Sequence, residues 1–322
     1  MRRFSFVAVL GSLIALAGCG GGGNSVTVPG TYVPTTTGGP FVYVTDGGYN
    51  ILQIAQSANG QLNPAAAISG PNTGLQGAAG IVRDASGNIY VADNSVSQIL
   101  VFAPGIAGNA QSRLQINGSA TGLLGPWGLA IDGQGRLNVT NTTANSVTIY
   151  AAGANGNVAP TVTIAGTATT LSSPTGIALD SAGNIYVANE TGSITVFAAG
   201  ASGNVAPIRT ITGAATGLNG PAGLCLDSSN NLYVANANGN SITEYAAGAT
   251  GNAAPTTTIA GSSTLLSEPQ GIVIGSGSLL FVTNYSVPHV PGLITVYPLS
   301  ASGNVAPSQS ITNMLGPIGI SL

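Results

Sequence analysis

The sequence has 322 residues, of which 44% are hydrophobic and only 5% are charged, and its formal net charge is −3 at pH 7. Ordinary globular domains have about a quarter of their residues charged, so Thr, Ser, Asn and backbone groups must keep this surface hydrated. The positive charges are six arginines, two of them at the extreme N-terminus, and there is no lysine. A protein that binds nucleic acid needs a basic stripe, so this composition excludes nucleic acid as a partner.

The first nineteen residues have the pattern of an export signal. Arg2 and Arg3 precede an apolar run over about residues 6–16, and small residues then lead to Cys19. The run is shorter than the roughly 20 apolar residues that cross a bilayer, so it is predicted to be a leader and not a permanent span. Residues 16–19, Leu-Ala-Gly-Cys, resemble the lipobox of bacterial lipoproteins, which implies that Cys19 is lipidated and begins the mature chain. The alternative is an ordinary cleaved leader in which the cysteine occurs by chance.

Residues 20–40 are predicted to be a flexible tether. They are rich in Gly, Thr and Pro and show no apolar period, so they bury too little surface to become ordered. Together with the lipobox, this segment implies a bacterial cell-envelope protein, held by its N-terminal lipid at the outer membrane, either on the periplasmic side or at the cell surface. Gly20, at the position where a retention signal would have Asp, favours the outer membrane.

The remaining chain, residues 41–322, repeats with a constant period. Glycines recur at spacings of 48, 48, 47, 48 and 48 residues, at Gly80, Gly128, Gly176, Gly223, Gly271 and Gly319. A fixed period of this length is typical of a repeat architecture. The segment holds six such units with no residues left over, which predicts one domain.

Within a unit, apolar residues alternate with smaller or polar ones, as they do in strands. In the unit that begins at Pro174, the alternation predicts four short strands near residues 177–179, 185–187, 194–196 and 209–212, separated by turns that contain Gly or Asn. Six four-stranded units without helices between them predict an all-β, six-bladed β-propeller of antiparallel blades. Residues 41–46 match a second strand and residues 316–322 supply a lone first strand, so the C-terminal strand is predicted to close the ring.

Two of the units show a family resemblance. Residues 174–189 and 221–236 both begin Pro-x-Gly-Ile/Leu-x-Leu-Asp and end Ile/Leu-Tyr-Val-Ala-Asn. This pattern resembles the NHL repeat and, more loosely, the gluconolactonase and senescence-marker propellers, and the likeness extends over about residues 41–322. It implies the propeller fold. It does not select an activity, because NHL-type propellers serve as binding modules, structural parts and occasional enzymes.

Because the strands alternate in direction, the loops fall on two faces. The top face collects the turns leading into the first strands and the second hairpins; the bottom face collects the first and third hairpins. The predicted top face therefore carries the ends of the second strands, namely Asp46, Asp93, Asn141, Asn189, Asn236 and Asn284. These side chains could bind sugar hydroxyls, or they could close turns. The bottom face carries Asp-x-x-Gly-Asn turns or close variants, in which Asp is expected to accept backbone N–H groups. Calcium is the alternative there, although one carboxylate per turn is too few for its six or more oxygen ligands.

Departures from the repeat suggest where a top-face ligand would bind. Trp127 is the only tryptophan and occupies the middle of a Pro-x-Gly turn, where the other complete units have Ala, Thr, Gln270 or Ile. An insertion of about four residues within 286–291 carries the only histidine, His289, and follows Tyr285. An aromatic and polar patch of this kind suits a carbohydrate or an extended peptide. Alternatively, Trp127 plugs the channel and the inserted loop has no role.

An enzymatic role is the second hypothesis. In the lactonase-like propellers that this chain resembles, Asn, Asp and Glu around the top of the channel hold a metal, partly from Pro-x-Gly turns. In this chain those turns have Trp, Thr, Ala, Gln and Ile, which are poor ligands for a hard cation. The amidating-lyase branch uses several histidines for zinc, and this chain has one. We therefore expect a binding or interaction module that acts through its top face, with a protein, peptide or glycan partner and no cofactor. A gluconolactonase-like hydrolase or lyase is the alternative, and a structural envelope spacer is the third.

Overall fold

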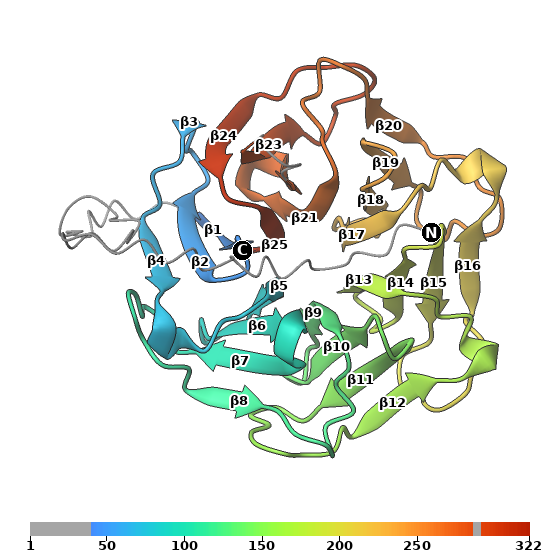
Figure 1. Ribbon diagram of the computed structural model, residues 1–322. Coiled ribbons are helices and arrows are strands. Elements are labelled where there is room, and N and C mark those ends of the chain that lie inside the picture. Colours follow the sequence, from blue (N-terminus) through green and yellow to red (C-terminus); the bar gives the residue numbers. More distant parts are fainter. Residues whose placement is uncertain (1–39, 286–290) are drawn as a thin grey trace, which may run out of the picture. The chain divides into compact units, whose positions relative to one another are not determined.

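The computed structural model describes residues 40–285 and 291–322. These residues form six antiparallel sheets around a common centre, so the predicted six-bladed β-propeller of four-stranded blades is confirmed (Figure 1). The leader, Cys19, nearly all of the 20–40 tether, and His289 lie outside the described residues. Short 3-10 turns are the only helical elements of the described part.

The blades are numbered along the chain, and the strands of each blade are named from the innermost to the outermost. Blade 1 consists of β25 (Pro317–Ser321), β1 (Phe41–Asp46), β2 (Asn50–Ala55) and β4 (Ala66–Ser69); blade 2 of β5 (Ala78–Arg83), β6 (Ile89–Asp93), β7 (Gln98–Phe102) and β8 (Leu114–Ile116); blade 3 of β9 (Pro126–Ile131), β10 (Leu137–Asn141), β11 (Ser146–Tyr150) and β12 (Val162–Ala165). Blade 4 consists of β13 (Pro174–Leu179), β14 (Ile185–Asn189), β15 (Ser193–Phe197) and β16 (Arg209–Thr212); blade 5 of β17 (Pro221–Leu226), β18 (Leu232–Asn236), β19 (Ser241–Tyr245) and β20 (Thr257–Ala260); blade 6 of β21 (Pro269–Gly275), β22 (Leu279–Asn284), β23 (Gly292–Pro298) and β24 (Gln309–Met314). The remaining elements are β3 (Gly60–Gln61), η1 (Pro71–Thr73), η2 (Asn94–Val96), η3 (Thr167–Thr169), η4 (Ala214–Thr216) and η5 (Ser276–Ser278).

The hydrophobic core lies between neighbouring blades. Tyr186 and Val196 of blade 4, for example, pack with Leu232 and Val234 of blade 5 in one buried cluster. Every blade has a neighbour on each side, so its middle strands are buried on both faces; all five residues of β14 are buried. This double burial explains why the polar residues of β14 and of its neighbours, such as Asn189 and Thr195, are buried along with the apolar ones.

The repeating glycines have a steric reason. Gly176 lies on β13 so close to the next blade that a Cβ atom there would come within 2.4 Å of the Ala222 carbonyl oxygen. The same contact recurs at all six glycines, each facing the carbonyl of the residue before the next blade's repeat glycine, and Gly319 closes the circle against Ala79. Only glycine permits the innermost strands to approach this closely.

The C-terminal strand completes blade 1, as predicted. β25 pairs with β1, and Asp46 accepts hydrogen bonds from the backbone N–H of Gly316 (2.8 Å) and Leu315 (3.2 Å). Thr45 accepts from the N–H of Gly319 (2.8 Å) and donates to the carbonyl of Ala79 in blade 2 (2.6 Å), so one hydroxyl joins β1 and β25 to the next blade.

Hydrogen bonds connect neighbouring blades at the outer edge of the ring, a feature that the sequence alone did not indicate. Gly203, in the third hairpin of blade 4, forms a parallel bridge to Ile164 on the outermost strand of blade 3. Its neighbour Asn204 accepts a hydrogen bond from the N–H of Ala168 at 2.8 Å. Parallel bridges of this kind occur at five blade junctions, and β3 pairs with β24 at the sixth. Each outermost strand therefore has part of its free edge covered by the following blade.

Candidate functional site

The six Asn and Asp residues predicted for the top face do lie there, but they are buried. Their exposed fractions are between 0% and 2%. Asn189 accepts the N–H of Ser172 at 3.0 Å and donates to the hydroxyl of Thr195 at 3.2 Å, and the equivalent residues bind the turn that leads into their own blade. The turn-closing interpretation therefore describes Asp46, Asp93, Asn141, Asn189, Asn236 and Asn284, and a surface ring for sugar hydroxyls does not.

Whether this position is Asn or Asp correlates with the residue at the middle of the third strand, which is Thr or Leu. In blades 3 to 6 the Asn amide donates to a threonine hydroxyl, from Thr148, Thr195, Thr243 or Thr295. Blades 1 and 2 have Leu52 and Leu100 there, and the acceptor-only Asp replaces Asn. Burial raises the pKa of Asp46 and of Asp93, and their backbone hydrogen bonds only partly offset it. One oxygen of Asp93 is buried without a hydrogen-bond partner.

The three described top-face residues that were singled out as candidates, Trp127, Gln270 and Tyr285, do not form one patch. Trp127 is partly buried on β9, in blade 3, and Tyr285 is partly buried after β22, in blade 6, which lies opposite blade 3 in the ring. Gln270 is only 8% exposed on β21. His289 falls within the undescribed insertion, so its relation to Tyr285 stays a prediction.

Exposed apolar side chains gather on the top face instead. Five of the seven large hydrophobic residues that are exposed in the described part of the chain lie in top-face loops. Leu315 is 69% exposed, Tyr49 62%, Leu124 50%, Leu265 49% and Val96 41%. Leu265 moreover has φ +59°, at a position where three other blades use glycine. A leucine that is both exposed and left-handed is unfavourable for folding alone.

Four of these residues lie on an arc of hydrogen-bonded top-face loops in blades 1 to 3, and we call these four the apolar sector: Leu315, Tyr49, Val96 and Leu124. Backbone contacts join their loops in series. The N–H of Gly47 donates to the carbonyl of Gly316 at 3.2 Å, and the N–H of Ala78 donates to the carbonyl of Gly48 at 2.9 Å. The loop before Ala78 is joined to the loop of Val96 by the N–H of Asn94, which donates to the carbonyl of Gly77 at 2.9 Å. The N–H of Gly125 then donates to the Ser97 hydroxyl at 3.3 Å. Trp127 lies two residues beyond Gly125, at one end of the arc.

Charge divides between the two faces. All four described arginines lie at the bottom, near the first or third hairpins: Arg83, Arg113, Arg136 and Arg209. The described charged residues at the top are all acidic, with Glu190 and Glu268 partly exposed beside the buried Asp46 and Asp93. The described top face is therefore apolar and negative, and the bottom face mixes both signs.

The bottom-face aspartates have the role that was predicted for them. Asp84 accepts the N–H groups of Ser86 (2.9 Å) and Asn88 (2.8 Å) within its own turn. Asp132, Asp180 and Asp227 repeat this arrangement. Burial alone would raise the pKa of Asp84, but its hydrogen bonds outweigh burial and hold the pKa below its usual range. Among the described residues, no three His, Cys, Asp or Glu side chains lie close enough together to hold a metal ion.

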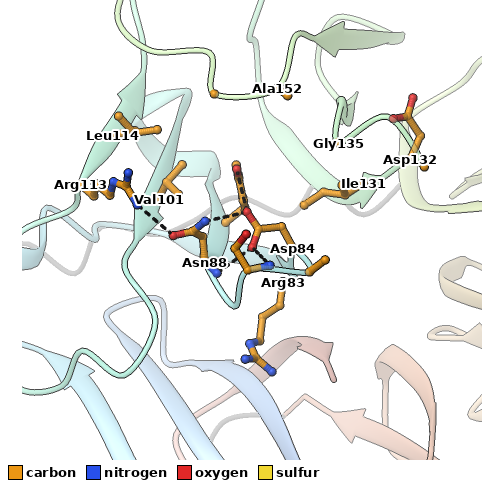
Figure 2. A pocket seen from close by; sticks show the side chains of 15 residues that line it. Arg83, Asp84, Asn88, Val101, Arg113, Leu114, Ile131, Asp132, Gly135 and Ala152 are labelled. Atoms are coloured by element: carbon orange, nitrogen blue, oxygen red, sulfur yellow. Dashed lines mark hydrogen bonds between the residues drawn. The ribbon is translucent and has the colours of Figure 1, made fainter.

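A pocket of about 620 Å³ opens between the bottom loops of blades 2 and 3, which the sequence alone did not indicate. Figure 2 shows Asn88 between Arg113 and Asp84, with Ile131 and Asp132 across from them. The pocket combines residues from two repeats nearly 50 positions apart, so no single motif could have indicated it. A similar groove of about 430 Å³ lies between blades 3 and 4.

These observations define the class of the protein as a closed six-bladed β-propeller. Comparison with known families identifies its units: residues 75–102 and 218–245 match the NHL repeat, and residues 162–195 match a beta-propeller repeat. The chain is thus an NHL-repeat propeller. No helix in the described residues is long and apolar enough to cross a membrane.

Solved structures share the fold at low identity. A protein of unknown function from Bacteroides caccae is similar with a TM-score of 0.62 and 10% identity, over 87% of this chain and 97% of that one. A catalytically inactive virginiamycin B lyase from Staphylococcus aureus, solved with quinupristin, gives a TM-score of 0.50 and 15% identity, over 90% of this chain and 98% of that one. A search of curated protein sequences finds no significant match. At these identities the likeness concerns the fold alone.

Proposed function

We propose that this propeller is an interaction module that binds a protein or peptide partner through the apolar sector of its top face. The observation that carries the proposal is the one-sided distribution of exposed hydrophobic residues, with Leu315, Tyr49, Val96 and Leu124 on connected loops. Large exposed apolar side chains gathered on one face are typical of interaction sites, since a monomer gains nothing by leaving them in water. Trp127, partly exposed beside the sector, would add an aromatic anchor of the kind that dominates binding energy.

The partner's chemistry follows from the same face. Glu190 and Glu268 are the partly exposed charges described there, and every described arginine lies on the other side. A partner segment with an apolar stripe and flanking positive charge would match both features. Because two exposed carboxylates give only weak long-range attraction, binding should depend on salt much less than on the apolar contacts.

The test uses a photo-crosslinking amino acid at Leu124, compared with one at Ile208, which is 54% exposed on the bottom face and serves as the matched control. We expect discrete crosslinked products from position 124 in cells and none from position 208. Replacing Val96 and Tyr49 by serine should remove those products while the melting temperature stays within about 1 °C. Equal crosslinking at 124 and 208, or products that persist after the serine replacements, would refute a top-face partner.

We also propose that the module is displayed in the bacterial cell envelope, on residues 20–40 as a spacer from lipidated Cys19. The support is the leader and lipobox pattern of residues 1–19. Metabolic labelling with a radioactive fatty acid should mark the wild-type protein and not a Cys19→Ser variant. Mass spectrometry of the mature N-terminus should find an acylated Cys19, and an unmodified N-terminus would contradict the proposal.

A further inference from the structure

We propose that the pocket between blades 2 and 3 binds a small organic carboxylate with an apolar body, and that Arg113 binds the carboxylate. This site lies on the bottom face, away from the apolar sector, and goes beyond the proposed top-face function. Its lining combines a guanidinium, polar groups and aliphatic side chains within about 620 Å³, a size typical of small-molecule sites.

Arg113 differs from the other described arginines in being exposed and in making no ion pair, ring contact or short hydrogen bond. Arg83 stacks over the ring of Tyr43 at 4.2 Å, Arg136 forms an ion pair with Asp132 at 2.7 Å, and Arg209 donates to the hydroxyl of Tyr186 at 2.6 Å. The side chain of Arg113, in contrast, is exposed and makes one weak hydrogen bond, to the Asn88 amide oxygen at 3.5 Å.

The two carboxylates beside the pocket do not satisfy Arg113. Asp84 receives hydrogen bonds on both oxygens, including one from the Asn88 amide at 2.7 Å. Asp132 is neutralised by Arg136. The guanidinium of Arg83 points away from the other labelled pocket side chains (Figure 2) and stacks over Tyr43, so it adds no charge to the pocket. With Asp132 paired to Arg136, Arg113 is the arginine of the pocket that is open to an anion, although the formal net charge of the protein is −3.

The choice of a carboxylate with an apolar body follows from geometry and lining. A planar guanidinium binds a carboxylate through two parallel hydrogen bonds, and the weak bond to Asn88 is all that it would have to give up. Val101, Leu114, Ile131 and Ala152 form an aliphatic part of the lining beside the polar groups. This part would cover the apolar body of a ligand and could not bind hydroxyl groups.

The neighbouring groove provides an internal comparison. It repeats the arrangement one blade further on, with Asp132 and Asp180 as its turn aspartates. The arginine that lines it is already paired, because Arg136 binds Asp132, and Thr161 occupies the position that corresponds to Arg113. The free guanidinium is thus specific to the junction of blades 2 and 3 and is not a product of the repeat.

The experiment measures binding of hexanoate to the purified protein by saturation-transfer NMR, with hexanamide as the uncharged analogue of the same shape. We expect hexanoate to bind with a dissociation constant of about 1 mM, and hexanamide at least about tenfold more weakly. Arg113→Gln should weaken hexanoate binding about tenfold or more and leave the weak hexanamide signal unchanged. Arg209→Gln, which removes an arginine outside the pocket, should have no effect on hexanoate.

Several outcomes would overturn the proposal. Equal binding of hexanoate and hexanamide would mean that no charge is recognised, and unchanged hexanoate binding by Arg113→Gln would place the anion elsewhere. No binding of hexanoate at 50-fold its expected dissociation constant, which is about 50 mM, would remove the site altogether. Tighter binding of glucuronate than of hexanoate would refute the apolar body. A variant is included only if its melting temperature equals that of the wild type, so that misfolding is not mistaken for lost binding.

Discussion

Replacing Asn189 by alanine tests the structural role of the buried top-face ring. Asn189 is fully buried at the end of β14. Its amide oxygen accepts the Ser172 N–H at 3.0 Å, and its amide nitrogen donates to the Thr195 hydroxyl at 3.2 Å. Alanine would leave both partners without these bonds at a junction that the rest of the fold holds in place. The variant should therefore lose stability, whether or not a ligand is present.

The size of the loss follows from those contacts. A buried polar group left without its partner costs about 1–3 kcal/mol, and the Ser172 N–H and the Thr195 hydroxyl are two such groups. Because Ser172 is only partly buried, its share lies at the low end of that range, and the sum for the two groups is about 2–5 kcal/mol. A domain of this size shifts its melting temperature by about 2 °C per kcal/mol, so the expected decrease is about 4–10 °C.

Differential scanning calorimetry of Asn189→Ala beside Asn238→Ala measures this effect. Asn238 is an exposed asparagine on the same face of the neighbouring blade, so its replacement should change the melting temperature by no more than about 1 °C. If Asn189→Ala melted like the wild type, its hydrogen bonds would not stabilise the blade, and a role in ligand binding would have to be reconsidered.

Three further changes follow from the ring geometry. Gly176→Ala would bring a Cβ within 2.4 Å of a carbonyl in the next blade and should cost about 1–3 kcal/mol or more in a thermal melt, whereas Gly133→Ala, with open space around it, should be neutral. Burial raises the folded pKa of Asp93 above its unfolded value, so the carboxyl stabilises the fold only while protonated, and this contribution is lost as the pH rises through the folded pKa. Leu100 is buried in a core cluster, so the double variant Asp93→Asn with Leu100→Thr, which recreates the Asn–Thr pair, is compared with Leu100→Thr alone. The double variant should melt above the single one at pH 7, with the gap closing toward pH 4; a gap independent of pH would contradict this assignment. Removing residues 316–322 takes the innermost strand from blade 1 and should abolish the cooperative melt, and an unchanged melt would refute ring closure by β25.

The fold could be predicted because its determinants are local and repeated. The period of glycines reports a contact made six times, and alternating apolar residues report strands. Closure was predictable because residues 316–322 match a first strand that blade 1 otherwise lacks. The Asp84 turn was predicted as well, since a carboxylate two and four residues from its N–H donors needs no other part of the chain.

The surface could not be predicted in the same way. Leu123 and Leu124 are adjacent and identical, yet Leu123 is 9% exposed in a core cluster and Leu124 is 50% exposed. The six Asn and Asp side chains were placed on the correct face, but only the structure shows that they point into their own turns.

The sequence by itself determined the architecture of this protein: the number of blades, their strands, the closing strand and the turn aspartates. Only the tertiary structure decided which side chains stay in water and which polar groups stay open to a ligand, such as the guanidinium of Arg113, which makes one weak hydrogen bond. The physical reason is the range of the contacts. Strand period and turn chemistry act within a few residues, whereas exposure and pocket formation depend on neighbouring blades whose contacting residues are nearly 50 positions apart along the chain.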